Sequence, residues 1–231
     1  MYNYDNSIGE IMAPCKRCGE FNKMKAWYNL DTSKYPDAKR KLIKKELFKY
    51  KCEKCGAVYL LCYEMMYHDA ENKVIIYLDP MTQYTKQIKK KIKKQKKELG
   101  KDYRFRIVKT ASELQEKAVF FEHKYDDKVI EMMVGEFVVN THYCNKNLIV
   151  DEVKFCVRDD SFEATLLCTD INTNEKVEKS NCMDYTNYKI NERNTYMLFK
   201  LKESLFIDSN WCAEQRKRNK KRLERKVRKY S

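Results

Sequence analysis

The sequence CKRCG at Cys15–Gly19 returns as CEKCG at Cys52–Gly56. Each copy places two thiolates close enough to bind one ion, and its glycine permits the left-handed backbone that such metal-binding turns commonly need. Four thiolates suit a closed tetrahedral zinc site, which leaves no open position for water or substrate. We therefore predict that a structural Zn²⁺ ion is bound by Cys15, Cys18, Cys52 and Cys55.

Two other chemistries use the same cysteine spacing. A thioredoxin-like redox centre has a single Cys-x-x-Cys within a βαβ unit, with one thiolate at a helix start, whereas both pairs here lie on strand-like segments. An iron–sulfur cluster also takes four cysteines. We favour zinc and keep redox and iron–sulfur chemistry as alternatives.

The composition is that of a folded chain. Of 231 residues, 43% are hydrophobic, and only 5 are glycine and 3 proline, which argues against a low-complexity or fibrous protein. The sequence begins with neither the basic start nor the apolar segment of a signal peptide, and no stretch approaches the length of a membrane span. Ten cysteines without an export signal favour a reducing compartment. We therefore expect a cytoplasmic protein.

The net charge of +14 is concentrated in two segments. Residues 86–101 hold nine lysines and one acid, and residues 212–231 hold ten Lys/Arg and two acids, so the rest of the chain is nearly neutral. Such segments bind polyanions or form solvated helix faces. The second segment has no aromatic side chains interleaved with its cations, so we expect sequence-indifferent contact with RNA or DNA phosphates, or with an acidic protein. A solvated tail that only keeps the protein soluble is the alternative. The candidate contacts are Arg216, Lys217, Arg218, Lys220, Lys221, Arg222, Arg225, Lys226, Arg228 and Lys229.

Hydrophobic periodicity predicts an α+β fold. The expected strands are 21–30, 47–50, 57–63, 73–78, 103–108, 153–157, 162–168 and 195–201. The expected helices are 36–47, 85–99, 110–121, one from Asp126 or Asp127 to Asn140, and one from Asn210. Thirty-three residues separate Cys18 from Cys52, and the first helix accounts for that length. We predict a helix-elaborated zinc ribbon with packed helices (9–140), then a small antiparallel β unit (147–208) and a basic C-terminal helix (209–231).

Several segments beyond the cysteines resemble the CpXC domain family. The matching segments are Cys15/Cys18, KELFKYKC at 45–52, Cys55-Gly56, Tyr67–Asp69 with the strand to Leu78, 106–108, 116–117 and 126–131. They follow one another in order over roughly residues 9–135. The family's proline is replaced by Lys16 and Glu53, but ligands and glycines remain, so we expect metal binding to be kept. The family has no established activity, so the resemblance implies a fold and leaves the role open.

The only local group with acid–base potential is Tyr67–Asp69. A histidine titrates near neutrality, and Asp69 could orient His68. However, neighbouring residues on a strand point to opposite faces, and a turn with local hydrogen bonds explains the pattern more simply. We therefore predict a zinc protein that binds without catalysis. An enzyme with a site near His68 and Asp69, or a purely structural protein-interaction module, is the alternative.

Overall fold

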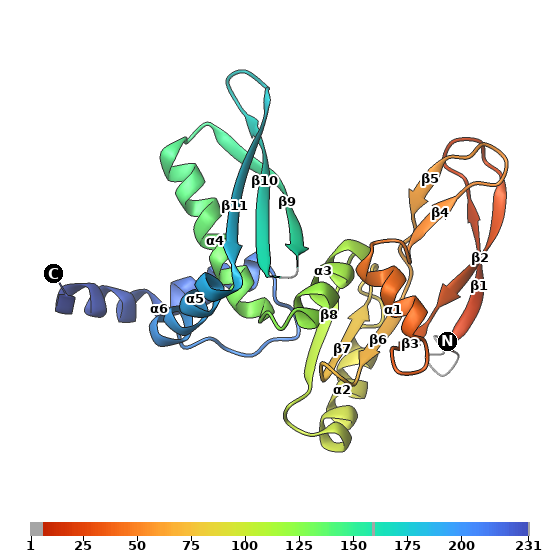
Figure 1. The fold of residues 1–231 in the computed structure, drawn as a ribbon, viewed down its shortest axis with the longest axis horizontal. Coiled ribbons are helices and arrows are strands. Elements are labelled where there is room, and N and C mark those ends of the chain that lie inside the picture. The colour runs from red at the N-terminus through yellow and green to blue at the C-terminus, as the bar shows by residue number, and fades with distance from the viewer. Residues whose placement is uncertain (1–6, 159, 231) are drawn as a thin grey trace. The chain divides into compact units, whose positions relative to one another are not determined.

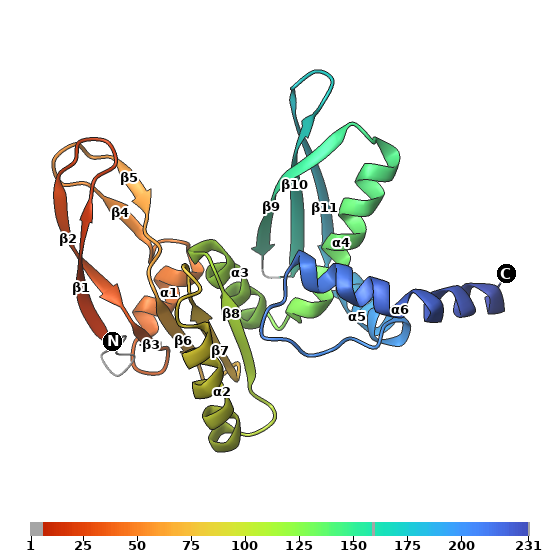
Figure 2. The same cartoon turned by 180° about the vertical axis from the view of Figure 1, so that it is seen from behind.

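The structure is a computed structural model that describes residues 7–158 and 160–230, with side chains described up to Glu224 in the last helix. This part of the chain holds six helices, eleven strands and four small sheets, so the predicted α+β class is confirmed. The chain divides into two compact units, Met1–Val119 and Phe120–Ser231 (Figures 1 and 2). The three-part division expected from the sequence stays a prediction.

Two short hairpins form one part of the first unit (Figure 1). Strand β1 (Ile8–Pro14) pairs antiparallel with β2 (Phe21–Trp27), and β4 (Lys49–Lys51) pairs antiparallel with β5 (Val58–Leu60). Burial alternates along β2 and β4, as expected of strands with one solvated face. One Cys-x-x-Cys turn connects the strands of each hairpin.

A four-stranded sheet forms the rest of the first unit. Its order is β3-β6-β7-β8, with β6 and β7 antiparallel and the two outer pairs parallel. All five residues of β7 are buried, because this continuous apolar strand lies in the middle of the unit. The strands are β3 (Asn29–Asp31), β6 (Met65–Asp69), β7 (Val74–Leu78) and β8 (Arg104–Val108).

The helices of the first unit are amphipathic to different degrees. Helix α1 (Pro36–Ile43) begins at a proline, which suits the first helical turn, and buries Ala38 and Leu42. Helix α2 (Thr85–Leu99) buries only Ile88 and Ile92 and leaves most of its lysines in solvent, as the thin apolar stripe predicts. Helix α3 (Ala111–Glu122) then leads into the second unit.

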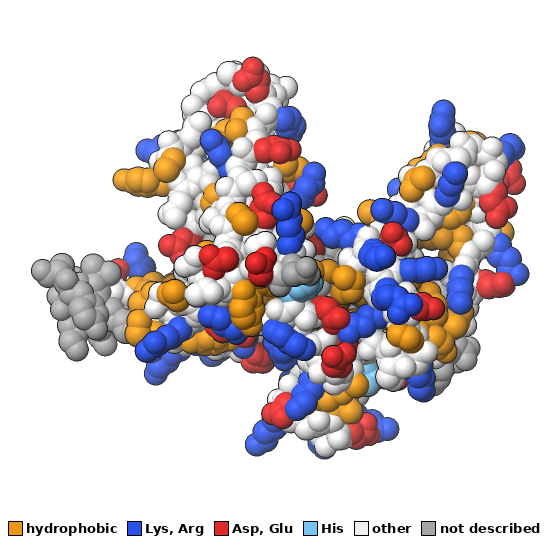
Figure 3. Space-filling view, in the orientation of Figure 1, with side chains coloured by type: hydrophobic (Ala, Val, Ile, Leu, Met, Phe, Trp, Pro, Cys, Tyr) orange, Lys and Arg blue, Asp and Glu red, His pale blue; other side chains and the backbone are white. Residues whose placement is uncertain are grey.

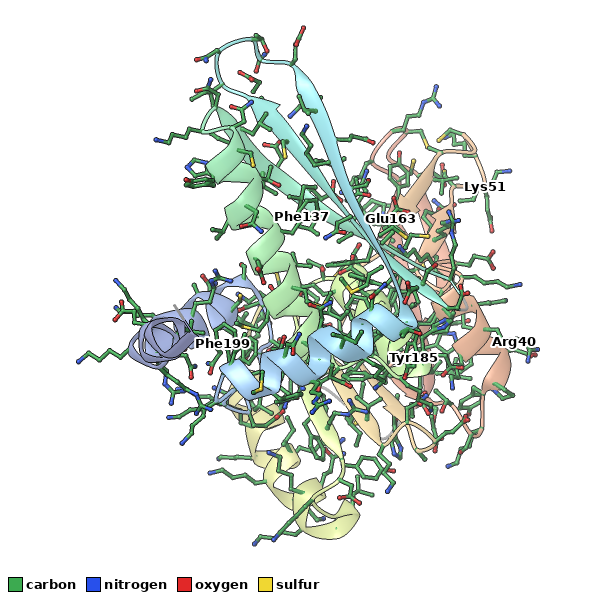
Figure 4. All side chains as sticks on the ribbon, turned by 60° about the vertical axis from the view of Figure 1, so that its left-hand side comes forward. Arg40, Lys51, Phe137, Glu163, Tyr185 and Phe199 are labelled. Carbon is green, nitrogen blue, oxygen red and sulfur yellow. The ribbon has the colours of Figure 1, made fainter. Side chains whose placement is uncertain are left out.

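The second unit packs helices on a three-stranded antiparallel sheet of order β11-β10-β9. Aromatic and branched side chains from helix and sheet form its main core, around Phe120, Tyr125, Phe162 and Tyr188. Phe137 on α4 packs against the same core and faces the sheet (Figure 4). The elements are α4 (Asp127–Cys144), β9 (Leu148–Arg158), β10 (Ser161–Asp170), β11 (Lys176–Asp184), α5 (Tyr185–Leu198) and α6 (Ser209–Tyr230).

The first half of α6 belongs to the core of this unit. Trp211 and Cys212 are buried with Met132 of α4, and Phe199 packs against that cluster (Figure 4). The side chains of Gln215 and Asn219 accept hydrogen bonds from backbone amides of the segment that precedes α6, both at 3.0 Å. The basic helix is therefore anchored through Asn219.

Several elements differ from the sequence prediction. The predicted strand at 195–201 is wrong, because most of this segment belongs to helix α5. Asp184 caps the start of α5 by accepting a hydrogen bond from the Asn187 amide, and burial of Tyr188 holds the helix on the core. Asn140 does not end α4, which continues to Cys144 with Thr141 buried. Strands β1, β6 and β11 were not predicted, and β6 rather than 57–63 pairs with β7. The predicted strand 21–30 is two strands, β2 and β3.

Candidate metal centre

The two Cys-x-x-Cys turns have the same backbone geometry. In each turn the glycine amide donates to the carbonyl of the first cysteine, from Gly19 to Cys15 and from Gly56 to Cys52, both at 2.9 Å. The glycines have φ of +74° and +70°, the left-handed region that favours residues without a Cβ. The repeated sequence therefore folds into a repeated turn.

These turns bring four sulfur atoms together. The Sγ atoms of Cys15, Cys18, Cys52 and Cys55 all lie within 4.8 Å of one another. Two of these distances join the two turns, at 3.5 Å between the sulfurs of Cys15 and Cys55 and 3.6 Å between those of Cys18 and Cys52. A regular tetrahedron with metal–sulfur bonds of about 2.3 Å has sulfur–sulfur edges of about 3.8 Å. The four cysteines fit that geometry and could hold a metal ion.

The first cysteine of each turn is enclosed. Cys15 is 2% exposed and Cys52 is 1% exposed, and both pack with Tyr50. Further apolar contacts come from Met24, Ala57 and Leu61. An apolar surrounding limits the access of water and strengthens the electrostatic attraction between an ion and its thiolate ligands.

Hydrogen-bond donors point at two of the sulfurs. The Tyr59 hydroxyl lies 3.5 Å from the Cys15 sulfur, and the side-chain nitrogen of Asn22 (Nδ2) lies 3.6 Å from the Cys52 sulfur. Such bonds orient metal-binding thiolates and offset part of their negative charge. They stabilise the thiolate form of the cysteine, which is the form that binds a metal ion.

Asn22 also connects the backbones of the two turns. Its side-chain nitrogen donates to the Glu20 carbonyl at 2.9 Å, and its side-chain oxygen accepts from the Glu53 amide at 3.2 Å. Sequence reasoning did not find this residue. The only signal was a polar residue at an inward position of β2, and that signal becomes clear only once the strand register is known.

The electrostatics of the site favour thiolates at the buried positions. Burial opposes ionisation of Cys15, but hydrogen bonds from the Tyr59 hydroxyl and from nearby backbone amides outweigh it and lower the pKa of this thiol to about 6. Hydrogen bonds from the backbone amides of Cys55 and Lys54 lower the pKa of Cys52 against burial. For Cys18, the Glu20 amide favours the thiolate, yet burial and the neighbouring sulfurs raise its pKa to about 12. A cation among the sulfurs would supply the positive charge that this fourth ligand needs.

The structure separates His68 from Asp69. These neighbours on β6 point to opposite faces of the strand. Asp69 is buried and accepts from the Tyr67 hydroxyl at 2.9 Å and from the Asn72 side chain at 3.0 Å, with the Lys39 ammonium at 3.1 Å. His68 lies 3.3 Å from the Tyr103 hydroxyl. Asp69 therefore holds a turn together, as the simpler explanation of this motif predicted.

The predicted cationic contacts lie on α6. Lys217, Arg218, Lys220 and Lys221 are exposed, and Arg216 and Arg222 are half-buried. One Arg222 nitrogen donates to the Met197 carbonyl at 3.2 Å, so this residue also ties α6 to the end of α5. The side chains of Arg225, Lys226, Arg228 and Lys229 lie outside the described residues. On the face drawn in Figure 3, basic side chains are spread over both units with acidic ones between them.

The comparisons with known proteins agree with the cysteine geometry. A family model described as CpXC protein matches residues 13–134. The chain belongs to the CpXC family. This CpXC segment contains both cysteine turns, the four-stranded sheet and the first half of α4. No curated protein and no solved structure matches the chain. Within the described residues, no helix combines the length and the apolar character needed to cross a membrane.

Proposed function

We propose that Cys15, Cys18, Cys52 and Cys55 bind one Zn²⁺ ion and that the first unit is a helix-elaborated zinc ribbon. The observation that carries this proposal is the mutual approach of four sulfur atoms, all within 4.8 Å, from two turns with the same backbone hydrogen bond. Thiolate sulfur is a soft ligand, and a tetrahedral four-sulfur set is typical of structural zinc. Four protein ligands fill the coordination shell, so the ion supports the fold without activating water.

Metal analysis of the purified full chain tests this proposal. We expect one zinc per chain, and we expect Cys52→Ser to lose it, because three thiolates and a hydroxyl bind zinc far more weakly. Cys182→Ser is the matched control, since Cys182 is an exposed cysteine on β11. Full zinc occupancy in Cys52→Ser, or iron and sulfide in place of zinc, would overturn the assignment.

For the role of the whole protein, we propose non-catalytic binding of nucleic-acid phosphates by α6. The supporting observation is that Trp211, Gln215 and Asn219 anchor one side of the helix while Lys217 and Lys220 stay in solvent. An anchored helix presents its cations without first having to fold. Because its contacts are to phosphates, binding should be indifferent to sequence and should weaken steeply with salt. A reducing cytoplasm, which keeps thiolates available for zinc, is the proposed location.

Charge reversal tests this role better than removal of the helix, because truncation would also remove the Trp211 anchor. The variant carries Glu at Lys217, Arg218, Lys220 and Lys221. The matched control carries Glu at four exposed lysines of α2, namely Lys86, Lys90, Lys93 and Lys97. We expect the wild type to bind mixed-sequence RNA and DNA at low salt. The α6 variant should bind them at least tenfold more weakly than the wild type, and the α2 variant should lose less affinity than the α6 variant. Equal losses in both variants would indicate only a net-charge effect. An acidic partner protein would be favoured if the wild type binds no nucleic acid.

A further inference from the structure

The exposed side of strand β2 alternates aromatic and basic residues. Asn22 and Ala26 are buried, so Phe21, Lys23, Lys25 and Trp27 point the other way. We call these four residues the β2 strip. Phe21 is 62% exposed, although a phenylalanine ring is normally buried. Exposed aromatic rings combined with cations are a feature of surfaces that bind single-stranded nucleic acid.

The neighbouring strand extends this surface. In the β1–β2 register, Pro14 lies opposite Phe21 and Met12 lies opposite Lys23. Met12 is also largely exposed. Of the described outward residues on the two strands, one is acidic: Glu10, which lies 2.6 Å from the Lys23 ammonium. Both partners of that ion pair are well exposed, so it is weak and exchanges readily with another anion. The face is apolar and basic.

The two aromatic residues of the strip are held differently. The Lys25 ammonium lies 4.7 Å from the centre of the Trp27 ring, and Tyr35 meets that ring edge-on at 4.8 Å. Trp27 is therefore fixed in place and half-buried. Phe21 is the open platform, at the end of the strip next to the metal turn, where Lys16 and Arg17 are exposed. With a rise of about 3.3 Å per residue, the strip is about 20 Å long from Phe21 to Trp27.

We propose that the β2 strip binds single-stranded nucleic acid, with an unpaired base stacked on Phe21 and the adjoining phosphates on Lys23 and Lys25. Charge and shape both support this occupant. The cations complement phosphates, and the flat exposed ring complements a base, which every nucleotide supplies. A duplex offers its phosphates but keeps its bases stacked inside, and an acidic peptide offers carboxylates without bases. This inference rests on the proposed nucleic-acid binding and adds to it the base stacking that the cations of α6 do not provide.

The other hairpin offers a matched control surface. Its outward side carries Val58 and Leu60, both more than half exposed, next to Lys49 and Lys51. Val58 pairs with Lys51, which Figure 4 labels on β4. This face therefore has the same mixture of apolar and basic residues, attached to the same metal centre, but its described outward residues on β4 and β5 include no aromatic ring. In Figure 3, basic and hydrophobic side chains lie next to one another over this part of the first unit.

The test measures binding of the full zinc-loaded chain to fluorescently labelled 20-nucleotide oligo(dT), oligo(U) and a mixed-sequence DNA duplex. The variants are Phe21→Ala, the double variant Lys23→Gln/Lys25→Gln, and Val58→Ala as the control. Zinc content and thermal melting of each variant are measured first. All the substituted side chains are exposed, so both should be unchanged.

We expect Phe21→Ala to weaken single-strand binding about tenfold or more and to leave duplex binding within about twofold, because stacking of one base is lost. Lys23→Gln/Lys25→Gln should weaken the binding of single strands and of the duplex, and should reduce the salt dependence of that binding. Val58→Ala should change neither. Single-strand binding by Phe21→Ala equal to that of the wild type, or an equal loss for single strand and duplex, would overturn the proposal.

Two further outcomes separate this proposal from the role of α6. A wild type that binds nucleic acid through α6, with Phe21→Ala unaffected, overturns the β2 strip alone. A wild type that binds neither single strands nor duplex at low salt overturns both proposals together. Poly-glutamate could compete with the labelled oligonucleotide as effectively as unlabelled oligo(dT) does, and its binding could weaken equally in Phe21→Ala. That result would indicate that the β2 strip binds an acidic peptide, and it would also overturn the proposed base stacking.

Discussion

The two cysteine-bearing hairpins and the sheet of the second unit are both antiparallel, but they are stabilised differently. Strands β1 and β2 have seven residues each and β4 and β5 have three, whereas β9, β10 and β11 have 11, 10 and 9. A two-stranded hairpin alone is at best marginally stable in water. The sheet of the second unit buries a cluster of aromatic rings, while the core cluster of the hairpins consists of two cysteines and a tyrosine and their other buried residues are small or polar, namely Ala13, Ala26 and Asn22. The proposed zinc ion would stabilise the hairpins where few large apolar side chains are buried.

Removal of the metal is the strongest way to test this comparison. Chelation should unfold the hairpins and leave the second unit folded, because structural zinc contributes on the order of 10 kcal/mol to the folding of small metal domains. Trp27 lies on β2 and Trp211 lies in the core of the second unit, so each reports on one region. In the two single-tryptophan variants, Trp27→Phe and Trp211→Phe, the emission of Trp27 should shift to the red and that of Trp211 should not. An unchanged Trp27 spectrum after complete metal loss would contradict a metal-dependent fold.

A core substitution should have the opposite regional effect. The Phe162 ring stacks on Phe155 at 5.7 Å and lies 6.0 Å from Tyr125, so Phe162→Ala leaves a cavity in the second unit. We expect a loss of about 3–5 kcal/mol of unfolding free energy, measured by urea denaturation of Trp211 fluorescence. Zinc content should stay the same as in the wild type. Cys182→Ser, on the outward side of the same sheet, should change stability by less than about 0.5 kcal/mol. Loss of zinc in Phe162→Ala would show that the two regions fold as one.

The buried carboxylate of Asp69 in the first unit predicts a pH effect. Burial alone would raise the pKa of Asp69, but hydrogen bonds from Asn72 and the charge of Lys39 outweigh it and hold the pKa below its usual value. Because the folded-state pKa is lowered, the stabilisation is present above the unfolded-state pKa of about 3.9 and is lost as the pH falls through the folded-state pKa. Asp69→Asn should therefore cost about 1.5–3 kcal/mol at pH 7 and less at pH 3.

The measurement for Asp69 is urea unfolding at both pH values, with Asp102→Asn as the control. Asp102 also pairs with a lysine, at 3.3 Å from Lys73, but its side chain is 79% exposed, so we expect almost no effect. An equal loss for Asp69→Asn at pH 7 and pH 3 would show that the charge of Asp69 does not contribute.

The smallest expected effect concerns the residue that links the two metal turns. Asn22→Ala removes the side-chain nitrogen that donates to the Cys52 sulfur and the side-chain oxygen that accepts from the Glu53 amide. We therefore expect roughly tenfold weaker zinc binding with an unchanged fold. Competition with a chromophoric chelator measures it. Lys23→Ala, at the next position of β2 and outward-facing, is the control and should bind zinc as tightly as the wild type. Equal affinities for Asn22→Ala and the wild type would show that the cysteines alone determine zinc binding.

The sequence predicted best where one local signal was strong. The cysteine spacing and the two glycines predicted the turns, Asp126 was one of two predicted caps of α4, and hydrophobic periodicity predicted the bounds of α2. It predicted worst where a short pattern fitted two structures. Residues 195–201 have a plausible strand pattern, but Asp184 begins a helix ten residues earlier and Tyr188 fixes it on the core. A local pattern cannot include that distant contact.

The sequence by itself determined the family, the α+β class and which four cysteines lie in matching turns, because each depends on residues close together in the chain. Only the tertiary structure decided how the turns meet, which residues support them and which surfaces stay open. The approach of Cys15 to Cys55 and of Cys18 to Cys52, the linking position of Asn22 and the exposure of Phe21 all depend on strand register. Register is set by pairing between segments, and a shift of one residue along β2 would turn Asn22 and Phe21 to the opposite faces of the hairpin.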